Sequence, residues 1–395
     1  MNEVVIVDGM RSPIGKFGGA LSSLSAVELG VQTAQALFKR INIDPQIVEE
    51  VVLGNVLSAG KGQNVARQVA IKSGIPMHTP AYVISNVCGS GLKAVISGAQ
   101  AILSGDREVV LVGGTESMSQ AAFVTSDARW GLRMGNSTLT DTILSDGLTD
   151  AFDDIHMGIT AENLASKFNI SREQQDLFSL NSQEKALAAI ENKHFASQIA
   201  PIQIKNRKGD SYMVDTDEGP RAGLTIEKLQ TLKPVFKKDG TVTAANASGI
   251  NDGAAMLLLM NKKKAIELGI PYKAVIKSYA FEGVDPKYMG YGPVVSSEKA
   301  LQKIGLSIDD IDLVESNEAF AAQSLAVAMN LKNDLEKTNI HGGAIALGHP
   351  IGASGARILT TLLYALEEKE AKLGLATLCV GGGMGVSVVV EREGQ

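Results

Sequence analysis

Residues 86–94 read Asn-Val-Cys-Gly-Ser-Gly-Leu-Lys-Ala, a glycine-rich turn between an apolar run at 81–84 and a segment with apolar residues at helical spacing. This order predicts a strand, a tight turn and a helix. Cys88 would then lie at or near the N-terminus of the helix, where unpaired backbone N–H groups and the helix dipole favour negative charge. We therefore expect the pKa of the Cys88 thiol to lie below its ordinary value of about 8.5.

The other cysteine, Cys379, ends a strand-like run and precedes three glycines at 381–383. Glycines let backbone N–H groups approach a bound group closely. A buried free cysteine usually behaves as a small apolar residue, but the glycines beside both cysteines favour a chemical role. By number alone, the two cysteines could also form one disulfide.

Two further segments carry candidate catalytic residues. Residues 341–357 form a glycine-rich loop that leads into another helix, and His349 lies in it between a glycine and a proline. Histidine titrates near neutrality, so it could serve as the base that a cysteine nucleophile needs. Asn317 follows a short strand-like run; on its own, such an asparagine is usually a turn residue.

Taken together and in order, these segments resemble the motifs of the thiolase family, and most closely those of its biosynthetic members. The motifs are NVCGSG at 86–91, NEAF at 317–320, GGAIALGHPIGASG at 342–355 and CVGGGMG at 379–385. The similarity also includes residues 4–19 and 156–163, so it covers essentially the whole chain.

The resemblance implies an α/β fold of five layers, αβαβα, built from two similar halves, with the active site where helix N-termini from both halves meet. A faint internal repeat agrees, because a glycine turn, a helix, a strand and a glycine cluster follow one another in each half. We expect an N-terminal half from 1–120 plus 242–270 and a C-terminal half from 271–395. The resemblance makes 121–241 an inserted loop domain that covers the coenzyme A site and carries a tetramerisation segment.

Several strand-like runs are continuously apolar, as expected for strands covered by helices on both faces. The runs are residues 4–8, 51–55, 109–113, 256–260, 275–279, 313–316, 375–379 and 386–391. Ser25 and Glu28 have the spacing of a capping box ahead of a helix. Asp44 with the following proline, and Ser307, are further helix-start signals.

The resemblance also assigns roles for joining two acetyl groups. Cys88 would become acetylated, His349 would take its proton, and Cys379 would remove the α-proton of the second acetyl-CoA, so both cysteines are expected as thiols. The enolate oxygen would be held by His349 and by a water that Asn317 positions. The tetrahedral intermediate would be held by the backbone N–H groups of Cys88 and Gly381.

Similar enzymes imply a set of coenzyme A contacts, with Arg221 near the nucleotide and two methionines, Met157 and Met289, narrowing the acyl pocket as in short-chain members. The pantetheine arm would lie against Leu148, His156, Met157, Ala244, Ser248, Ala319 and Phe320. For Met157 and Phe320, ordinary core packing is the alternative. The chain departs from its relatives at His341, often an asparagine, and at Lys228, often a small polar residue. These departures leave the local hydrogen bonding of the histidine loop and the adenine-side contacts open.

Composition sets broad limits. A chain of 395 residues with 45% apolar residues can form two or three domains. A net charge of −6 without a basic stripe argues against nucleic-acid binding, so an anionic ligand must meet local positive charge. No apolar run approaches the roughly 20 residues of a membrane span, and because the first strand-like run starts at about residue 3 we expect no leader. We expect a cytoplasmic homotetramer without metal or cofactor, whose substrates are CoA, acetyl-CoA and acetoacetyl-CoA.

Three functions compete. The favoured one is Claisen condensation of two acetyl-CoA to acetoacetyl-CoA and CoA, with the reverse thiolysis, through an acetyl-cysteine. A degradative 3-ketoacyl-CoA thiolase would share the catalytic residues and have a wider acyl pocket. A non-catalytic acyl-CoA-binding protein could use glycine turns at helix N-termini to bind phosphates, but it assigns no task to Cys379 or His349. The physiological direction depends on metabolite levels rather than on the sequence.

Overall fold

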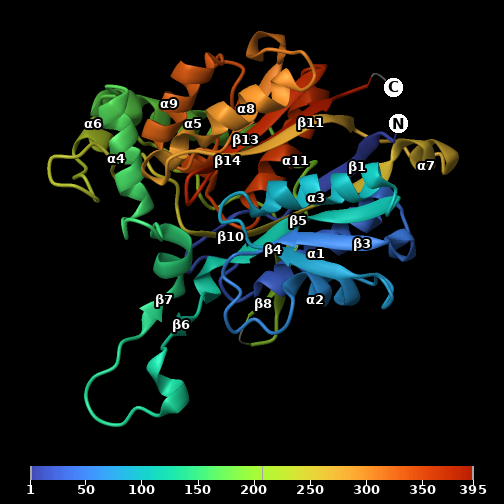
Figure 1. Ribbon diagram of the computed structural model, residues 1–395, viewed down its shortest axis with the longest axis horizontal. Helices are drawn as coiled ribbons and strands as arrows, with labels where there is room; N and C mark the ends of the chain where they lie inside the picture. Colours follow the sequence, from blue (N-terminus) through green and yellow to red (C-terminus); the bar gives the residue numbers. More distant parts are fainter. Residues whose placement is uncertain (1, 207, 394–395) are drawn as a thin grey trace.

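A computed structural model describes residues 2–206 and 208–393. Its dominant element within these residues is one 10-stranded sheet (Figure 1). The strands are β1 Val4–Arg11, β2 Gly15–Lys16, β3 Glu50–Gly54, β4 Ala81–Ile84, β5 Val109–Ser117, β10 Asn251–Asn261, β11 Ala274–Gly283, β12 Leu313–Ser316, β13 Leu373–Val380 and β14 Met384–Glu391. Their order is β12-β13-β14-β11-β1-β10-β5-β3-β4, and β2 pairs with β10.

The sheet consists of two similar halves. In the first, β3 runs parallel to β4 and β5, and β10 is antiparallel to β5 and β1. In the second, β12 runs parallel to β13, and β14 is antiparallel to β13 and β11. The halves join at β1 and β11, where Val5 pairs with Val275 and Ile6 with Ala274. The expected repeat is therefore present. The short pairing between β1 and β11 joins the strands of its two halves into one continuous sheet.

Helices complete five layers. They are α1 Ala26–Ile41, α2 Val65–Lys72, α3 Ser90–Ser104, α4 Met157–Lys167, α5 Arg172–Glu191, α6 Ile226–Gln230, α7 Lys262–Glu267, α8 Gly292–Gln302, α9 Ala321–Leu331, α10 Ala344–Leu347 and α11 Ser354–Glu368. The outer faces are covered by α1 and α2 on the first half and by α8 on the second, while α3 and α11 pack on each other between the halves. The predicted αβαβα arrangement is confirmed.

Local signals set most element starts. Each of the eight strand-like runs coincides with a strand, and several of these strands extend beyond the run, as β10 does. The run at 51–55 is one residue too long at its end, because β3 stops at Gly54. The capping box of Ser25 and Glu28 begins α1 as predicted. The signals at Asp44 and Ser307 begin only short 3-10 helices, Pro45–Ile47 and Ile308–Asp310.

The two central helices meet backbone to backbone at their N-termini. A Cβ atom on Gly355 would lie 2.3 Å from the Leu92 nitrogen, and one on Gly91 would lie 2.9 Å from the Ala356 nitrogen. Real Cβ atoms do not approach so closely, so both positions require glycine. The glycine turns of the two halves therefore bring the loops that carry Cys88 and His349 to one place.

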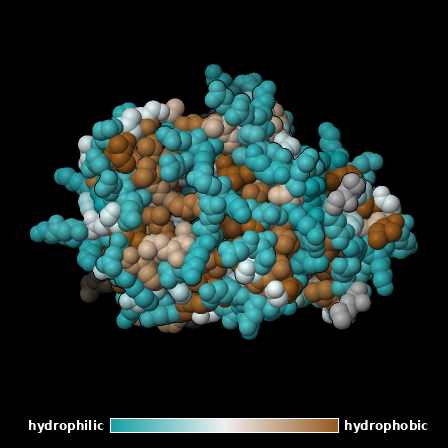
Figure 2. Space-filling model, turned by 90° about the horizontal axis from the view of Figure 1, so that it is seen from above, coloured by the Kyte–Doolittle hydropathy of each residue, from teal (hydrophilic) through white to brown (hydrophobic). Residues whose placement is uncertain are grey.

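By length and composition, one described segment, Val87–Ser104, could cross a membrane, and 61% of it is buried inside the protein. The expectation that no run approaches span length is thus wrong for this window. The segment contains α3, which packs against β3, β5 and α11, so core packing explains its apolar character. On the face seen from above, hydrophilic residues are interspersed with smaller apolar areas (Figure 2).

The middle segment, 121–241, contains α4, α5 and α6 together with two small hairpins. Strands β6 Phe123–Val124 and β7 Thr140–Asp141 form the base of an arm that projects from the molecule (Figure 1). Strands β8 Ile202–Lys205 and β9 Ser211–Val214 form the second hairpin.

Candidate active site

Cys88 lies in a strained turn just before α3. Val87 has φ 43°, in the left-handed region that β-branched residues rarely adopt. Ser90 holds the turn, because its hydroxyl accepts from the Asn86 N–H at 2.8 Å and donates to the Val87 carbonyl at 2.7 Å. The Gly89 N–H closes the turn on the Asn86 carbonyl at 3.0 Å. Such strain is typical of functional residues held in place by their surroundings.

The electrostatics of Cys88 differ from the expectation. Cys88 is 8% exposed, and burial raises the pKa of its thiol to about 11, opposed by hydrogen bonds from the backbone N–H groups of Gly381 and of Cys88 itself. The expectation of a pKa below 8.5 is wrong because loss of hydration outweighs the helix N-terminus. The resting Cys88 is therefore a neutral thiol, and it needs a base to become a nucleophile.

His349 is a neutral imidazole with a defined orientation. Burial, with the positive charge of Arg357, lowers the pKa of His349 to about 3. Its Nδ1 lies 2.5 Å from the Ser354 hydroxyl oxygen, which also donates to the Pro350 carbonyl at 2.9 Å. A hydroxyl has one proton, so donation to the carbonyl makes Nδ1–H the donor toward Ser354. Nε2 then carries the lone pair that can accept a proton.

Asn317 faces the same imidazole. Its Nδ2 lies 3.5 Å from His349 Nε2, and its Oδ1 accepts from Arg357 Nη2 at 3.5 Å. Arg357 is buried and lies 3.6 Å from a Glu315 carboxylate oxygen. Because a guanidinium can only donate, Arg357 turns the amide oxygen toward itself and the amide NH2 toward His349.

Cys379 is fully buried at the end of β13 and belongs to the apolar cluster that contains Met157, Met289 and Phe320. Burial, and after it the negative charge of an ionised Cys88, raise the pKa of Cys379. The two sulfurs are therefore close enough to influence each other's ionisation. An acylated Cys88 cannot ionise, so its negative charge would no longer raise the pKa of Cys379.

A largely apolar cavity of about 310 Å³ brings together most of the predicted residues. The predicted residues that line it are Cys88, Leu148, His156, Met157, Ala244, Ser248, Met289, Ala319, Phe320 and His349. Cys379, Asn317 and Gly381 are not in this lining, and the contacts given above tie them to its wall. Arg221 lies in an adjoining cavity of about 230 Å³ that also contains Lys16 and shares Ala244 with the first.

Sequence reasoning missed one wall of the cavity, which contains Val235 and Phe236. The Phe236 ring stacks on His156 with centroids 4.5 Å apart and meets Phe320 edge-on at 6.3 Å. The only available signal was an aromatic residue within a basic stretch of a chain with few aromatics. Phe236 adds an apolar surface beside the predicted pantetheine contacts.

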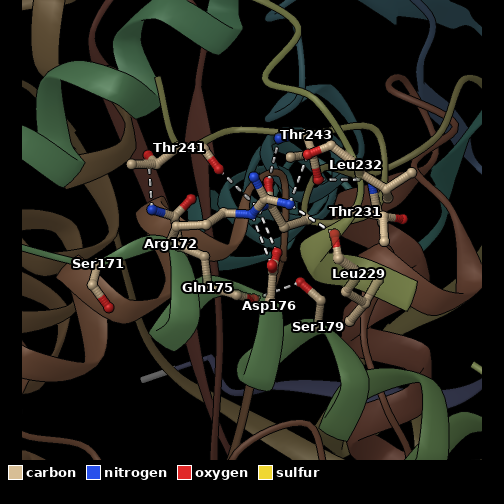
Figure 3. A network of polar contacts seen from close by, with 12 residues as sticks. Ser171, Arg172, Gln175, Asp176, Ser179, Leu229, Thr231, Leu232, Thr241 and Thr243 are labelled. Atoms are coloured by element: carbon tan, nitrogen blue, oxygen red, sulfur yellow. Dashed lines mark hydrogen bonds and ion pairs between the residues drawn. The ribbon is translucent and has the colours of Figure 1, made fainter. Parts of the chain in front are cut away.

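A polar network fixes this wall to α5 (Figure 3). Arg172 pairs with Asp176 at 2.7 Å and donates to the carbonyls of Leu229 and Leu232 at 2.7 and 3.0 Å. Gln175 donates to the Thr241 hydroxyl at 2.9 Å. The segment that carries Phe236 contains no helix or strand, and these hydrogen bonds hold it at both ends.

Two buried carboxylates hold the loop that carries His349. Glu318 accepts from the Ser182 hydroxyl at 2.7 Å, from Asn339 Nδ2 at 2.8 Å and from the Ile345 N–H at 3.2 Å. Glu116 accepts from the Gly352 N–H at 3.0 Å. Glu318 lies inside a motif recognised from the sequence, whereas nothing in the sequence distinguishes Glu116.

The two departures from the family pattern lie outside the cavity lining. Lys228 lies in α6, and its ammonium group donates to the Gly223 carbonyl at 2.7 Å. His341 stacks on His194 with ring centroids 4.7 Å apart. The sequence left the contacts of these two residues open. In the structure, Lys228 donates to a backbone carbonyl of its own segment, and His341 stacks on another histidine.

A five-layer fold with a thiol before one central helix and a histidine before the other defines a class of acyl-transferring enzymes. The chain matches the family descriptions "Thiolase, N-terminal domain" over residues 4–263 and "Thiolase, C-terminal domain" over residues 270–392. It belongs to the thiolase family and is an acyltransferase.

Relatives resemble the chain over its whole length. An acetyl-CoA acetyltransferase of Pseudomonas aeruginosa is 55% identical over 393 residues, which cover 100% of both chains. The crystal structure of the Bacillus anthracis acetyl-CoA acetyltransferase superposes with a TM-score of 0.97 at 46% identity and covers 100% of this chain and 99% of that one. Human mitochondrial 3-ketoacyl-CoA thiolase superposes with a TM-score of 0.96 at 42% identity, covering 99% of each chain. Both enzyme types thus share this fold.

Proposed function

We propose that this chain is an acetyl-CoA C-acetyltransferase, which condenses two acetyl-CoA to acetoacetyl-CoA and CoA and catalyses the reverse thiolysis. The observation that carries the proposal is the convergence of Cys88 and His349 on one cavity, with Cys379 coupled to Cys88 and the Gly381 N–H directed at the Cys88 sulfur. A non-catalytic acyl-CoA-binding protein would have no need for this convergence.

In the first half-reaction, His349 Nε2 takes the Cys88 proton as the sulfur attacks the acetyl-CoA carbonyl carbon. The carbonyl oxygen becomes an oxyanion, held by the N–H groups of Cys88 and Gly381. When the carbonyl re-forms, the bond to the CoA sulfur breaks, and CoA leaves with the proton from His349. A neutral His349 is the protonation state that this step requires.

In the second half-reaction, Cys379 gives its proton to His349 Nε2, and the resulting thiolate removes a methyl proton from a second acetyl-CoA. The enolate oxygen is held by the protonated His349 Nε2 and by a water positioned by Asn317, and the enolate carbon attacks the acetyl group on Cys88. The new carbon–carbon bond displaces the Cys88 sulfur, which takes the proton from His349 and becomes a thiol again. A high pKa makes the Cys379 thiolate a strong base for a weakly acidic methyl group, and acetylation of Cys88 favours its formation.

Chain length distinguishes the two enzyme alternatives. Met157 and Met289 line the cavity and fill space that a longer acyl tail would need, and extra methylenes against a packed wall cost about 1–3 kcal/mol. Thiolysis of acetoacetyl-CoA should exceed that of a six-carbon 3-ketoacyl-CoA by at least about tenfold in kcat/KM, measured on purified protein with CoA.

Met289→Ala should narrow that gap, whereas Met329→Ala on the exposed side of α9 serves as the matched control and should not. Equal rates on four-carbon and longer substrates in the unmodified enzyme would favour the degradative thiolase.

Asn317→Ala should lower kcat roughly 10²-fold, the scale of one lost oxyanion donor, and change KM much less. The reason is that Asn317 Nδ2 faces His349 and the proposed water rather than the cavity itself. Steady-state kinetics of condensation measure both constants, with Asn330→Ala on α9 as the control. A change mainly in KM would instead make Asn317 a residue that shapes the substrate pocket.

We further propose that 121–241 forms a loop domain that covers CoA, with 1–120 plus 242–270 and 271–395 as the two halves, and that the enzyme is a cytoplasmic homotetramer without a cofactor. Lys16 and Arg221 offer positive charge to CoA phosphates in the adjoining cavity. The arm between β6 and β7 exposes Phe123, Trp130 and Met134, an apolar surface that supports assembly through this arm.

A further inference from the structure

Three side chains that could bind a metal meet at one point, and none of them lines the two cavities at the proposed active site. His194 Nδ1 lies 2.9 Å from Glu368 Oε2, and His341 Nε2 lies 3.0 Å from the same oxygen. The three potential ligand atoms all lie within 4.8 Å of one another. We call these residues the His194 cluster.

The cluster joins three separate parts of the fold. His194 follows α5 in the middle segment, His341 precedes the glycine pair of the loop that carries His349, and Glu368 is the last residue of α11. Ser354, the partner of His349, begins the same helix, which is about 21 Å long at 1.5 Å per residue. The cluster is therefore remote from the reacting sulfur atoms but is connected to the loop that carries the catalytic base.

His341 has unmet hydrogen-bonding capacity. It is 5% exposed, and among the described residues neither ring nitrogen has a hydrogen-bond partner, although Nε2 is close to the Glu368 carboxylate. Its ring instead stacks on His194 and meets Phe195 edge-on. Buried polar groups are nearly always satisfied, and an exception calls for a specific explanation such as an ion.

The donor set suits a transition metal. Two imidazoles and one carboxylate bind zinc at about 2.0–2.2 Å, commonly with water as the fourth ligand. Ligand atoms around such an ion are roughly 3.3 Å apart, which follows from those bond lengths. The observed nitrogen–oxygen separations of 2.9 and 3.0 Å are close to this value. Magnesium and calcium prefer oxygen ligands and are poorly matched.

The cluster is also accessible. The side chains of His194 and Glu368 are 31% and 26% exposed, so an ion and its water can enter from solvent. Lys369 lies 2.8 Å from Glu368 Oε1, the other carboxylate oxygen. Oε2 thus remains directed at the two histidines.

We propose that His194 Nδ1, His341 Nε2 and the Glu368 carboxylate bind one divalent transition-metal ion of the zinc type. The ion fastens the end of α5 and the His349 loop to the end of α11. It touches neither substrate nor reacting atoms, so its effect is on stability.

The test measures zinc binding by calorimetry and thermal unfolding. It uses a full-length Cys88→Ala/Cys379→Ala background, because both thiols could bind zinc themselves. We expect one zinc per chain and a higher Tm with zinc but not with magnesium. His341→Asn should weaken binding by more than the roughly 10–100-fold that follows loss of an outer-sphere partner.

Two further variants keep the result interpretable. His78→Asn replaces an exposed histidine outside the cluster and should bind zinc like its parent. Glu368→Gln preserves the shape of a cluster residue while removing its charge and should lose binding as His341→Asn does. Absence of zinc binding in the parent, or unchanged binding in both cluster variants, would overturn the proposal and leave a histidine–glutamate contact without metal. This outcome is independent of the catalytic assignment.

Discussion

Replacing Cys88 with alanine is expected to lower kcat/KM for condensation and for thiolysis by about 10⁵–10⁶-fold, the scale seen when an enzyme loses its nucleophile. No other described thiol lines the cavity, since Cys379 is fully buried outside its lining. Incubation with labelled acetyl-CoA, digestion and peptide mapping should place the label on Cys88 in the unmodified protein. No label should remain in the variant.

Cys88→Ser is the matched variant, because it retains the size of the side chain and the N–H groups around it. Its thermal unfolding should resemble that of the unmodified protein, which separates lost chemistry from lost structure. Label on Cys379, or on no cysteine, in the unmodified protein would contradict the assignment of Cys88 as the acyl carrier.

Replacing Cys379 with alanine is expected to separate the two half-reactions. Acetylation of Cys88 should persist, since His349 and the N–H groups of Cys88 and Gly381 are unchanged. Condensation should fall by about 10²–10⁴-fold, the usual contribution of a general base. The measurements are labelled acetyl transfer to the protein, acetoacetyl-CoA formation, and exchange of the acetyl-CoA methyl protons with deuterated water.

Near-normal methyl exchange in Cys379→Ala would remove this thiol from the mechanism and would point to His349 as the base for both steps. Loss of acetylation together with exchange would instead show that Cys379 is needed to keep Cys88 in its strained turn. The cavity created by removing one buried sulfur is small, so the Tm should change little.

Much of the candidate site could be predicted from short motifs. Glycines flank Cys88, His349 and Cys379, and two glycines close to Cys88 and His349, Gly91 and Gly355, are needed for the close packing of the two central helices. The pKa of Cys88 could not be predicted this way. A helix N-terminus is a local signal, whereas burial depends on residues that come from the other half of the fold.

The position of Phe236 and the His194 cluster could not be predicted from the sequence for the same reason. Phe236 lies beside His156 only because Arg172 and Gln175 hold a segment through contacts that span 57 or more positions of the chain. The His194 cluster draws on positions 194, 341 and 368. No local sequence pattern indicates contacts between residues so far apart in the chain. A single histidine in a loop is common and does not by itself indicate a metal site.

The sequence by itself determined the eight predicted strands, the five-layer arrangement through its family resemblance, and the identity of the residues proposed for catalysis. These depend on side-chain periodicity and on turns that need glycine, both of which are local properties of the chain. Only the tertiary structure decided the continuous sheet at Val5 and Val275, the raised pKa of Cys88 and the neutral state of His349. Each of these features depends on burial or pairing between segments that are distant in sequence. Burial removes hydration from Cys88 and His349, and the tertiary structure determines which charged groups lie near them, so neither pKa can be read from local sequence.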